Sequence, residues 1–303
     1  MSQSPAAAPR FGRGYLTWAM GLLLLLYTSN FIDRQVLTVL QQPIKEELKL
    51  TDGQLGLLQG FAFAIFYSIL GIPIARLAER RSRKTIIAVS VLVWSAMTAL
   101  CGTAANFATL FLFRVGVGVG EAGSSPPAHS MIADYYPPRK RATALSVYSL
   151  GIPLGSLLGA VLGGLVAQRY GWRSAFFVVG LPGVVLAILA QFTLREPPRG
   201  HSETVEAAER DPAGDALQDV GAQAPSLGAV LRRLLSKRSF LHLAAGATLA
   251  SFAGYGVNAF AAPYYIRTFG LSLAQVGLLF GVIAGVGAGV GVLAGGAISD
   301  AAG

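Results

Sequence analysis

Four ionisable side chains lie inside long apolar stretches of the sequence: Asp33, Arg34, Arg114 and Glu121. At the centre of a bilayer each of them costs ~2.5–3.5 kcal/mol on insertion scales, so we expect them to pair with one another or to face water. Arg114 and Glu121 are seven residues apart, which places them on one face of a helix but about 10 Å apart along its axis. Each is therefore expected to reach towards another helix or a cavity. Ion pairs that only hold two helices together are the alternative explanation.

The stretches that carry these charges are long enough to cross a membrane. The chain has 303 residues, of which 53% are apolar and 13% charged, and no Asp, Glu, Lys or Arg occurs in 142–168, 174–194, 239–266 or 268–299. Because a helix needs ~20 residues to cross hydrocarbon, the sequence predicts an all-α, multi-pass membrane protein and excludes a soluble or disordered chain. We expect eight spans, at about 15–40, 53–76, 85–104, 108–133, 142–168, 174–194, 239–266 and 273–299.

The distribution of Lys and Arg predicts the orientation. The N-terminal tail and the loops after the second, fourth and sixth spans hold most of these residues, which predicts a cytoplasmic N-terminus in the inner (plasma) membrane. The net charge of +9 then reflects topology beside anionic membrane lipids, and we expect no nucleic-acid partner.

Composition divides the chain into four regions: a cytoplasmic tail at 1–14, a six-helix bundle at 15–194, a cytoplasmic linker at 195–238 and a partial second bundle at 239–303. The linker has no aromatic residue and four prolines, as is typical of a segment without its own core. Near 227–238 its apolar residues recur at helical spacing among basic ones, which predicts an amphipathic helix on the membrane surface.

Other motifs indicate no chemistry beyond this. Gly118, Gly120 and Gly123 match the spacing of a dinucleotide-binding loop, but they lie inside an apolar span rather than after a strand, so we reject nucleotide binding. No phosphate loop, hydrolase motif or metal-ligand pattern is present in the sequence, and we expect no cofactor, no metal and no enzymatic activity. The single cysteine, Cys101, is expected to be a packing residue.

A short pattern recurs at the ends of the second and eighth predicted spans. Ala75-x3-Glu79-x2-Ser82 returns as Gly296-x3-Asp300-x2-Gly303, which indicates two halves of similar plan. The second copy stops where its basic residues should follow. We therefore expect the chain to be truncated after its eighth span.

These motifs carry a family resemblance. The loop Ala75-x3-Glu79-Arg80-x-Ser82-Arg83-Lys84 resembles the signature of the major facilitator superfamily, with Ala75, Ser82 and Glu79 replacing its glycines and aspartate. Arg114-x3-Gly118-x-Gly120 and Gly151-x-Pro153-x-Gly155-x3-Gly159 are similar to its fourth-helix and fifth-helix motifs. Within that superfamily, the chain resembles the Spinster family at four segments: Asn30-Phe31-Ile32-Asp33-Arg34, Gly118-x-Gly120-Glu121, Ile132-x-Asp134-Tyr135-Tyr136 and Tyr255 to Tyr265.

The resemblance implies a fold and a role for several residues. It implies a six-helix N-terminal bundle followed by the first two helices of a second bundle, around a central site. Asp33 and Glu121 become candidate proton acceptors, because movement of a nearby arginine can switch the proton occupancy of a carboxylate in a low-dielectric cavity. Arg34 and Arg114 are expected to pair with them or with an anionic substrate. The remaining candidate substrate-binding residues are Tyr27, Phe31, Ser125, His129 and Asn258, for each of which packing is an alternative.

The resemblance also assigns two further sets of residues to conformational change. A cytoplasmic gate is expected from Glu79, Arg80, Arg83 and Asp134, with simple positive-inside anchoring as the alternative. Glycines at every fourth residue are expected to form the surface between the two halves, with tight packing as the alternative: Gly151, Gly155 and Gly159 in one span and Gly281 and Gly285 in another.

The function expected is therefore secondary active transport. The substrate would be an amphipathic, lipid-like or organic anionic small molecule, moved by alternating access and coupled to protons. The full-length protein is expected to be a monomer. The alternative is a truncated, non-transporting membrane protein that acts as a binder or receptor.

Overall fold

The computed structural model describes residues 11–203 and 227–291, and within these ranges all regular structure is helical. Two π-helical turns, η1 and η2, interrupt the α-helices. The elements in chain order are α1 (Arg13–Leu48), α2 (Asp52–Gly56), η1 (Leu57–Phe61), α3 (Ala62–Arg80), α4 (Arg83–Cys101), α5 (Phe107–Glu121), α6 (Ser125–Tyr135), α7 (Pro138–Ser149), α8 (Gly151–Thr193), α10 (Leu227–Leu235), α11 (Arg238–Phe269), α12 (Leu273–Gly281) and η2 (Val282–Gly287).

Six helical segments of the described chain are long and apolar enough to cross a membrane, against eight expected spans. The expected span 108–133 is divided between α5 and α6, because a turn at 122–124 precedes two prolines in the first turn of α6. The expected spans 142–168 and 174–194 run together through α7 and α8, with the change of direction at Gly171. Gly171 has φ 82°, a conformation that favours glycine. The count differs, but within the described residues the same apolar segments are helical, and residues 292–299 of the last expected span lie outside them.

Helix starts are fixed by local sequence at the end of the molecule that carries α2. Thr51, Asn106 and Ser272 each cap the helix that follows through a capping box, at α2, α5 and α12. At the same end, α1 continues to Leu48, eight residues beyond the expected end of its span. We call the end of the molecule that carries the turn from Arg80 to Lys84 the basic end. The end that carries α2, at the other side of the bundle, is called the opposite end.

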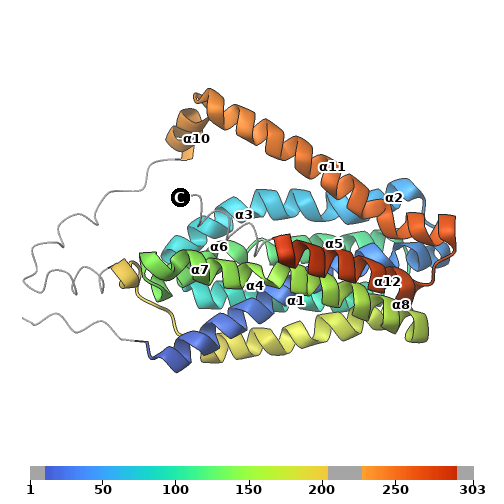
Figure 1. The fold of residues 1–303 in the computed structure, drawn as a ribbon, viewed down its shortest axis with the longest axis horizontal. Coiled ribbons are helices and arrows are strands. Elements are labelled where there is room, and N and C mark those ends of the chain that lie inside the picture. The colour runs from blue at the N-terminus through green and yellow to red at the C-terminus, as the bar shows by residue number, and fades with distance from the viewer. Residues whose placement is uncertain (1–10, 204–226, 292–303) are drawn as a thin grey trace, which may run out of the picture.

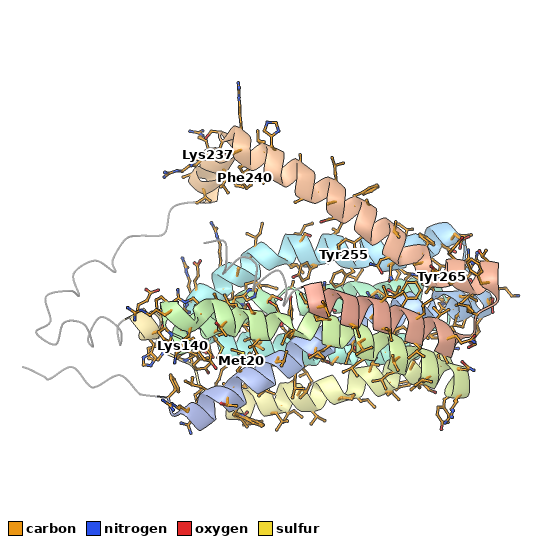
Figure 2. The ribbon with its side chains drawn as sticks, in the orientation of Figure 1. Met20, Lys140, Lys237, Phe240, Tyr255 and Tyr265 are labelled. Atoms are coloured by element: carbon orange, nitrogen blue, oxygen red, sulfur yellow. The ribbon has the colours of Figure 1, made fainter. Side chains whose placement is uncertain are left out.

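Helices α1 to α8 form the N-terminal bundle, and α11, α12 and η2 belong to the second half (Figure 1). Two clusters of buried residues fill the N-terminal bundle, one around Leu23 and Trp94 and one around Leu40 and Phe176. The second half is much less buried: in α11 only Ala262 and Pro263 are buried. Figure 1 shows α11 meeting the bundle near α2 and leaning away from it towards α10. Figure 2 shows Lys237 and Phe240 at the end of α11 that is far from the bundle, and Tyr265 at the end that joins it.

The two halves also meet where α8 packs against α12 and η2, and here the expected glycine surface needs correction. A Cβ added to Gly151, Gly155 or Gly159 would strike Tyr27, Thr28, Phe31 or Ile32, so these three glycines pack against α1 inside the N-terminal bundle. Gly281 and Gly285 do face α8, where they meet Leu157 and Pro153. The glycine of α8 that faces α12 is Gly164, which lies against Gly277. A four-residue glycine spacing marks a face of a helix, and it does not say which neighbour covers that face.

Candidate functional site

The centre of the site is an ion pair between α1 and α5. Arg34 Nε donates to Glu121 Oε2 at 2.7 Å, and the Glu121 side chain is 0% exposed while that of Arg34 is 22% exposed. Two of the four charges that the sequence places inside apolar spans are thus directly paired, across two helices. Arg34 keeps part of its guanidinium accessible and can contact a further anion.

Aromatic rings surround this arginine. The Arg34 guanidinium carbon lies 5.0 Å from the ring centre of Phe31, 4.5 Å from that of Phe63 and 5.2 Å from that of Tyr67. Arg114 reaches the same Phe63 ring, at 5.9 Å. Cation–π contacts of this kind stabilise a cation that has left water, so the rings hold Arg34 in place without consuming its hydrogen bonds.

Arg34 and Arg114 both line a cavity of about 270 Å³ between the two halves. Tyr255, Asn258 and Ala259 of α11 close one side of it, and Figure 2 marks Tyr255 on α11. The N-terminal bundle supplies the rest of the lining, which comprises Phe31, Arg34, Gln35, Thr38, Gln59, Phe63, Arg114 and Ser156. Four sequence-predicted substrate residues therefore come together in one cavity: Phe31, Arg34, Arg114 and Asn258.

Asp33 lies behind this cavity rather than in its wall. Its side chain is fully buried, and neither carboxylate oxygen accepts a hydrogen bond from the described residues. Its charged neighbours are Glu121 and Arg114, and Thr98 and Trp94 of α4 are also close. Arg114 Nε and Nη1 and Glu121 Oε1 are likewise buried without a partner among the described residues. Buried polar atoms are nearly always hydrogen-bonded, so this cluster is unusual for a part of the molecule that only packs.

Three predicted substrate residues lie outside the cavity lining, in an aromatic group next to it. Tyr27 stacks on Tyr148 with ring centres 4.2 Å apart, and the His129 ring meets Tyr148 edge-on at 5.3 Å. Ser125 also lies close to the same tyrosine. In this conformation Tyr27, Ser125 and His129 hold α7 against α1 and α6.

At the basic end the expected gate has a different membership. Arg83, 1% exposed, pairs with Asp134 and, at 2.7 Å, with Glu196. It also donates to Ser130 at 2.8 Å and to the carbonyl oxygen of Pro197 at 2.6 Å. Glu79 and Arg80 are exposed and form no ion pair with any described residue. The network therefore joins α4, α6 and the segment after α8, all within the N-terminal bundle.

Glu196 is the member of this network that the sequence did not reveal. Burial alone would raise its pKa, but hydrogen bonds from Arg83, from the Lys84 backbone N–H and from Ser82 outweigh burial, and the pKa of Glu196 is lowered. The signal that was available is an acid directly before Pro197 and Pro198, where the chain leaves the last span of the bundle.

A second network, at the opposite end, was also missed. Asp52, at the start of α2, accepts hydrogen bonds from Lys45 and from Arg267 of α11, each at 2.8 Å. Arg267 also donates to Gln42 of α1 at 2.7 Å. These exposed contacts tie α11 to α1 and α2, and so join the two halves of the molecule.

The fold and the site define a multi-pass α-helical membrane protein with a charged cavity between two sets of helices. In the described part of the chain no group of three or more His, Cys, Asp or Glu side chains could hold a metal ion.

A family model described as the Major Facilitator Superfamily matches residues 23–303, and the chain belongs to that superfamily. It is 37% identical over 293 residues to an MFS-type efflux pump of Mycolicibacterium smegmatis, an alignment that covers 97% of this chain and 64% of the pump. It is 30% identical over 246 residues to the protein spinster of Drosophila melanogaster, covering 81% of this chain and 38% of that protein.

A solved structure is similar over most of the chain. It is a bacterial homologue of the human lysosomal transporter Spinster, in an inward-facing and unoccupied conformation, and it is 38% identical with a TM-score of 0.79. The alignment covers 92% of this chain and 61% of that one. The resemblance to Spinster proteins is confirmed, and the chain spans less than two thirds of the length of these relatives.

Proposed function

We propose that this chain belongs to a secondary active transporter that moves an amphipathic or organic anionic small molecule by alternating access. The observation that supports it best is the cavity that Arg34 and Arg114 share with Tyr255 and Asn258 of α11. A cavity lined by both halves changes its access when one half tilts against the other, and sites of this kind lie near the bilayer midplane in transporters.

The lining favours an anion that carries apolar surface. One guanidinium nitrogen of Arg34 donates to Glu121, and two of Arg114 have no hydrogen-bond partner among the described residues. Both arginines can therefore donate to a carboxylate or phosphate. Phe31, Phe63 and Tyr255 line the same cavity and suit an apolar or ring-shaped portion of the substrate.

Proton coupling is proposed at Asp33 and Glu121. A substrate anion that draws Arg34 away from Glu121 leaves a buried carboxylate unpaired, and a proton on that carboxylate removes the cost of the unpaired buried charge. Asp33, next to Glu121 and Arg114 but without a hydrogen-bond donor among the described residues, can take part in the same exchange. The movement of one arginine then links substrate and proton.

The orientation proposed is that the protein lies in the inner (plasma) membrane with its basic end towards the cytoplasm. The exposed Arg76, Arg80 and Arg81 lie there, and the positive-inside rule assigns such a loop to the cytoplasm. The N-terminus then also lies in the cytoplasm.

Flux into proteoliposomes tests the proposal, with and without an inward or outward pH gradient. The two probes are lysophosphatidylglycerol, an anion with a long apolar tail, and glucuronate, an anion without one. We expect gradient-driven flux of at least one probe in the wild type. We expect Asp33→Asn to keep exchange at equal pH but to lose the response to the gradient.

Two variants define the controls. Arg34→Gln should abolish both flux and the thermal stabilisation that the probe confers, because it removes the anion contact. Glu46→Gln changes an exposed carboxyl on α1 far from the cavity and should behave as wild type. Wild-type, gradient-driven flux by Asp33→Asn would refute its role as a proton site. Saturable binding without flux in every condition would instead support the alternative, a binding protein that does not transport.

A further inference from the structure

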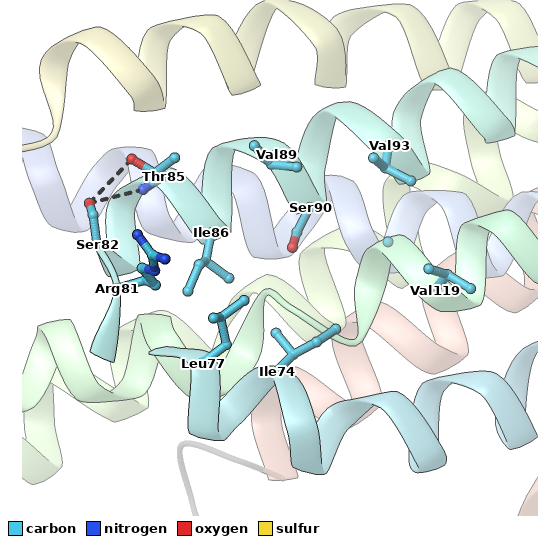
Figure 3. A pocket seen from close by; sticks show the side chains of 11 residues that line it. Ile74, Leu77, Arg81, Ser82, Thr85, Ile86, Val89, Ser90, Val93 and Val119 are labelled. Atoms are coloured by element: carbon cyan, nitrogen blue, oxygen red, sulfur yellow. Dashed lines mark hydrogen bonds between the residues drawn. The ribbon is translucent and has the colours of Figure 1, made fainter. Parts of the chain in front are cut away.

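A second cavity lies on the outer face of the N-terminal bundle and shares no lining residue with the central one. It is an elongated groove of about 640 Å³ between α3, α4 and α5. Figure 3 shows it from close by. Its apolar wall comprises Ile74, Leu77, Ile86, Val89, Val93 and Val119.

The groove opens to the surroundings of the bundle. Val89 of α4 is 54% exposed and Leu77 of α3 is 48% exposed, and both line it. These residues belong to membrane-spanning helices, so the medium that meets the opening is lipid. An opening in that position is accessible to an acyl chain without passage through the central cavity.

One end of the groove is polar. Figure 3 shows Arg81, Ser82 and Thr85 together at this end, with Val93 and Val119 at the other. Ser82 Oγ already donates to Glu196 and accepts from the Thr85 backbone N–H. Arg81 is exposed, and its guanidinium makes no hydrogen bond or ion pair with the described residues. At the polar end of the groove, the guanidinium of Arg81 can therefore bind an anion, and it lies at the basic end of the molecule.

We propose that this groove binds one anionic glycerophospholipid from the leaflet at the basic end. The phosphate contacts Arg81, and an acyl chain lies along α4 from Thr85 to Val93, a path of about 12 Å at the helical rise. Charge complementarity favours an anionic over a zwitterionic headgroup, because Arg76, Arg80 and Lys84 flank the site and Glu79 is the one acid between Gly71 and Lys84. The site is independent of the transport proposal.

The experiment is native mass spectrometry of the delipidated chain, titrated with phosphatidylglycerol or with phosphatidylcholine of identical tails. We expect one saturable phosphatidylglycerol and weaker phosphatidylcholine binding. Arg81→Gln should weaken phosphatidylglycerol binding about fivefold, since one cation near an anionic lipid surface contributes about 1 kcal/mol. Its matched control, Arg76→Gln, removes the same charge nearby but outside the lining and should change binding by less than half as much.

A second pair of variants tests the acyl-chain path without altering charge. Val89→Trp fills the groove from its exposed rim and should remove the saturable component for both lipids. Leu92→Trp adds the same ring to an exposed position of α4 outside the groove and should leave it intact. Equal effects of Arg81→Gln and Arg76→Gln would show diffuse attraction and overturn the proposal. So would unchanged binding by Val89→Trp, or a disulfide-linked dimer through Val89→Cys, which would make a second copy the occupant.

Discussion

The two ends of the molecule are both held by arginine–carboxylate pairs, but among the described residues only the opposite end has such a pair between the two halves. At the basic end Arg83 is buried and binds Asp134, Glu196 and Ser130, all within the N-terminal bundle. At the opposite end Arg267 is partly exposed and reaches from α11 to Asp52 of α2, across the two halves. A buried, multiply bonded pair makes its own bundle rigid, whereas an exposed pair is easily exchanged for water.

This difference suits an N-terminal bundle that moves as one body. The second half meets it through an exposed ion pair at the opposite end, between Arg267 and Asp52, and through small residues between α8 and α12. Nothing comparable joins α11 to the bundle at the basic end, where its described residues are exposed (Figure 1). Among the described residues, α11 thus contacts the N-terminal bundle at the opposite end and stands apart from it at the basic end, as one extreme of a rocking motion would require.

The largest effect is expected from breaking the buried network. Arg83→Gln leaves Asp134 and Glu196 without their cation, and removing one partner of a buried pair costs about 3–5 kcal/mol. We expect a large loss of thermal stability, measured by fluorescence-detected size exclusion after heating. Arg80→Gln, one turn away and exposed, should melt as wild type. If the two variants had the same melting temperature, the buried network would not stabilise the basic end.

The next largest loss of stability is expected from a steric variant inside the N-terminal bundle. A Cβ on Gly120 would lie 2.6 Å from the backbone nitrogen of Trp94, so Gly120→Ala forces α5 away from α4 at a cost of about 1–3 kcal/mol. Gly246→Ala, in the exposed half of α11, meets nothing within 4 Å and should leave stability unchanged or slightly raised. The same heating assay compares them. Equal melting of both variants would contradict the contrast between a packed bundle and a loosely held helix.

The sequence predicted the helices of the bundle better than it predicted the contacts between distant segments. Apolar runs located each of the helical segments of the described chain that are long and apolar enough to cross a membrane, because exclusion of charge from hydrocarbon acts along the chain. The buried charges on α1 and α5 were also recognisable as residues that need partners, and Arg34 and Glu121 do meet. Local patterns in a sequence show which residues share a helix face, but they do not show which neighbouring helix covers that face.

Pairings between distant segments were not predictable in this way. Asp52 and Arg267 are separated by most of the chain, and each by itself resembles an ordinary charge at a helix end. Gly151, Gly155 and Gly159 were assigned to the wrong neighbour because small residues permit close approach to any helix, and α1 occupies that face. Glu79 matched the position of a family aspartate, but Glu196 supplies the carboxylate that reaches Arg83.

A smaller effect, on conformation rather than stability, is expected at the opposite end. Asp52→Asn weakens the exposed contacts to Lys45 and Arg267 and should shift the population with this end open by less than about fivefold. Spin labels at Glu46→Cys and Thr268→Cys would report the distance between α1 and α11, and the buried Cys101 leaves little background labelling. Lys49→Gln, an exposed charge outside the network, serves as the control. A shift as large with Lys49→Gln would attribute the effect to general surface charge.

The smallest effect is expected from pH at the basic end. Because the pKa of Glu196 is lowered in the folded chain, its contribution to stability is fully present above the unfolded value near 4.3 and is lost as pH falls through the lowered value. Stability from this network should therefore stay constant between pH 8 and pH 5 and decline only in stronger acid. Melting curves of wild type and Glu196→Gln should run parallel above pH 5 and converge below pH 4. Divergence of the two curves between pH 8 and pH 5 would contradict the lowered pKa of Glu196.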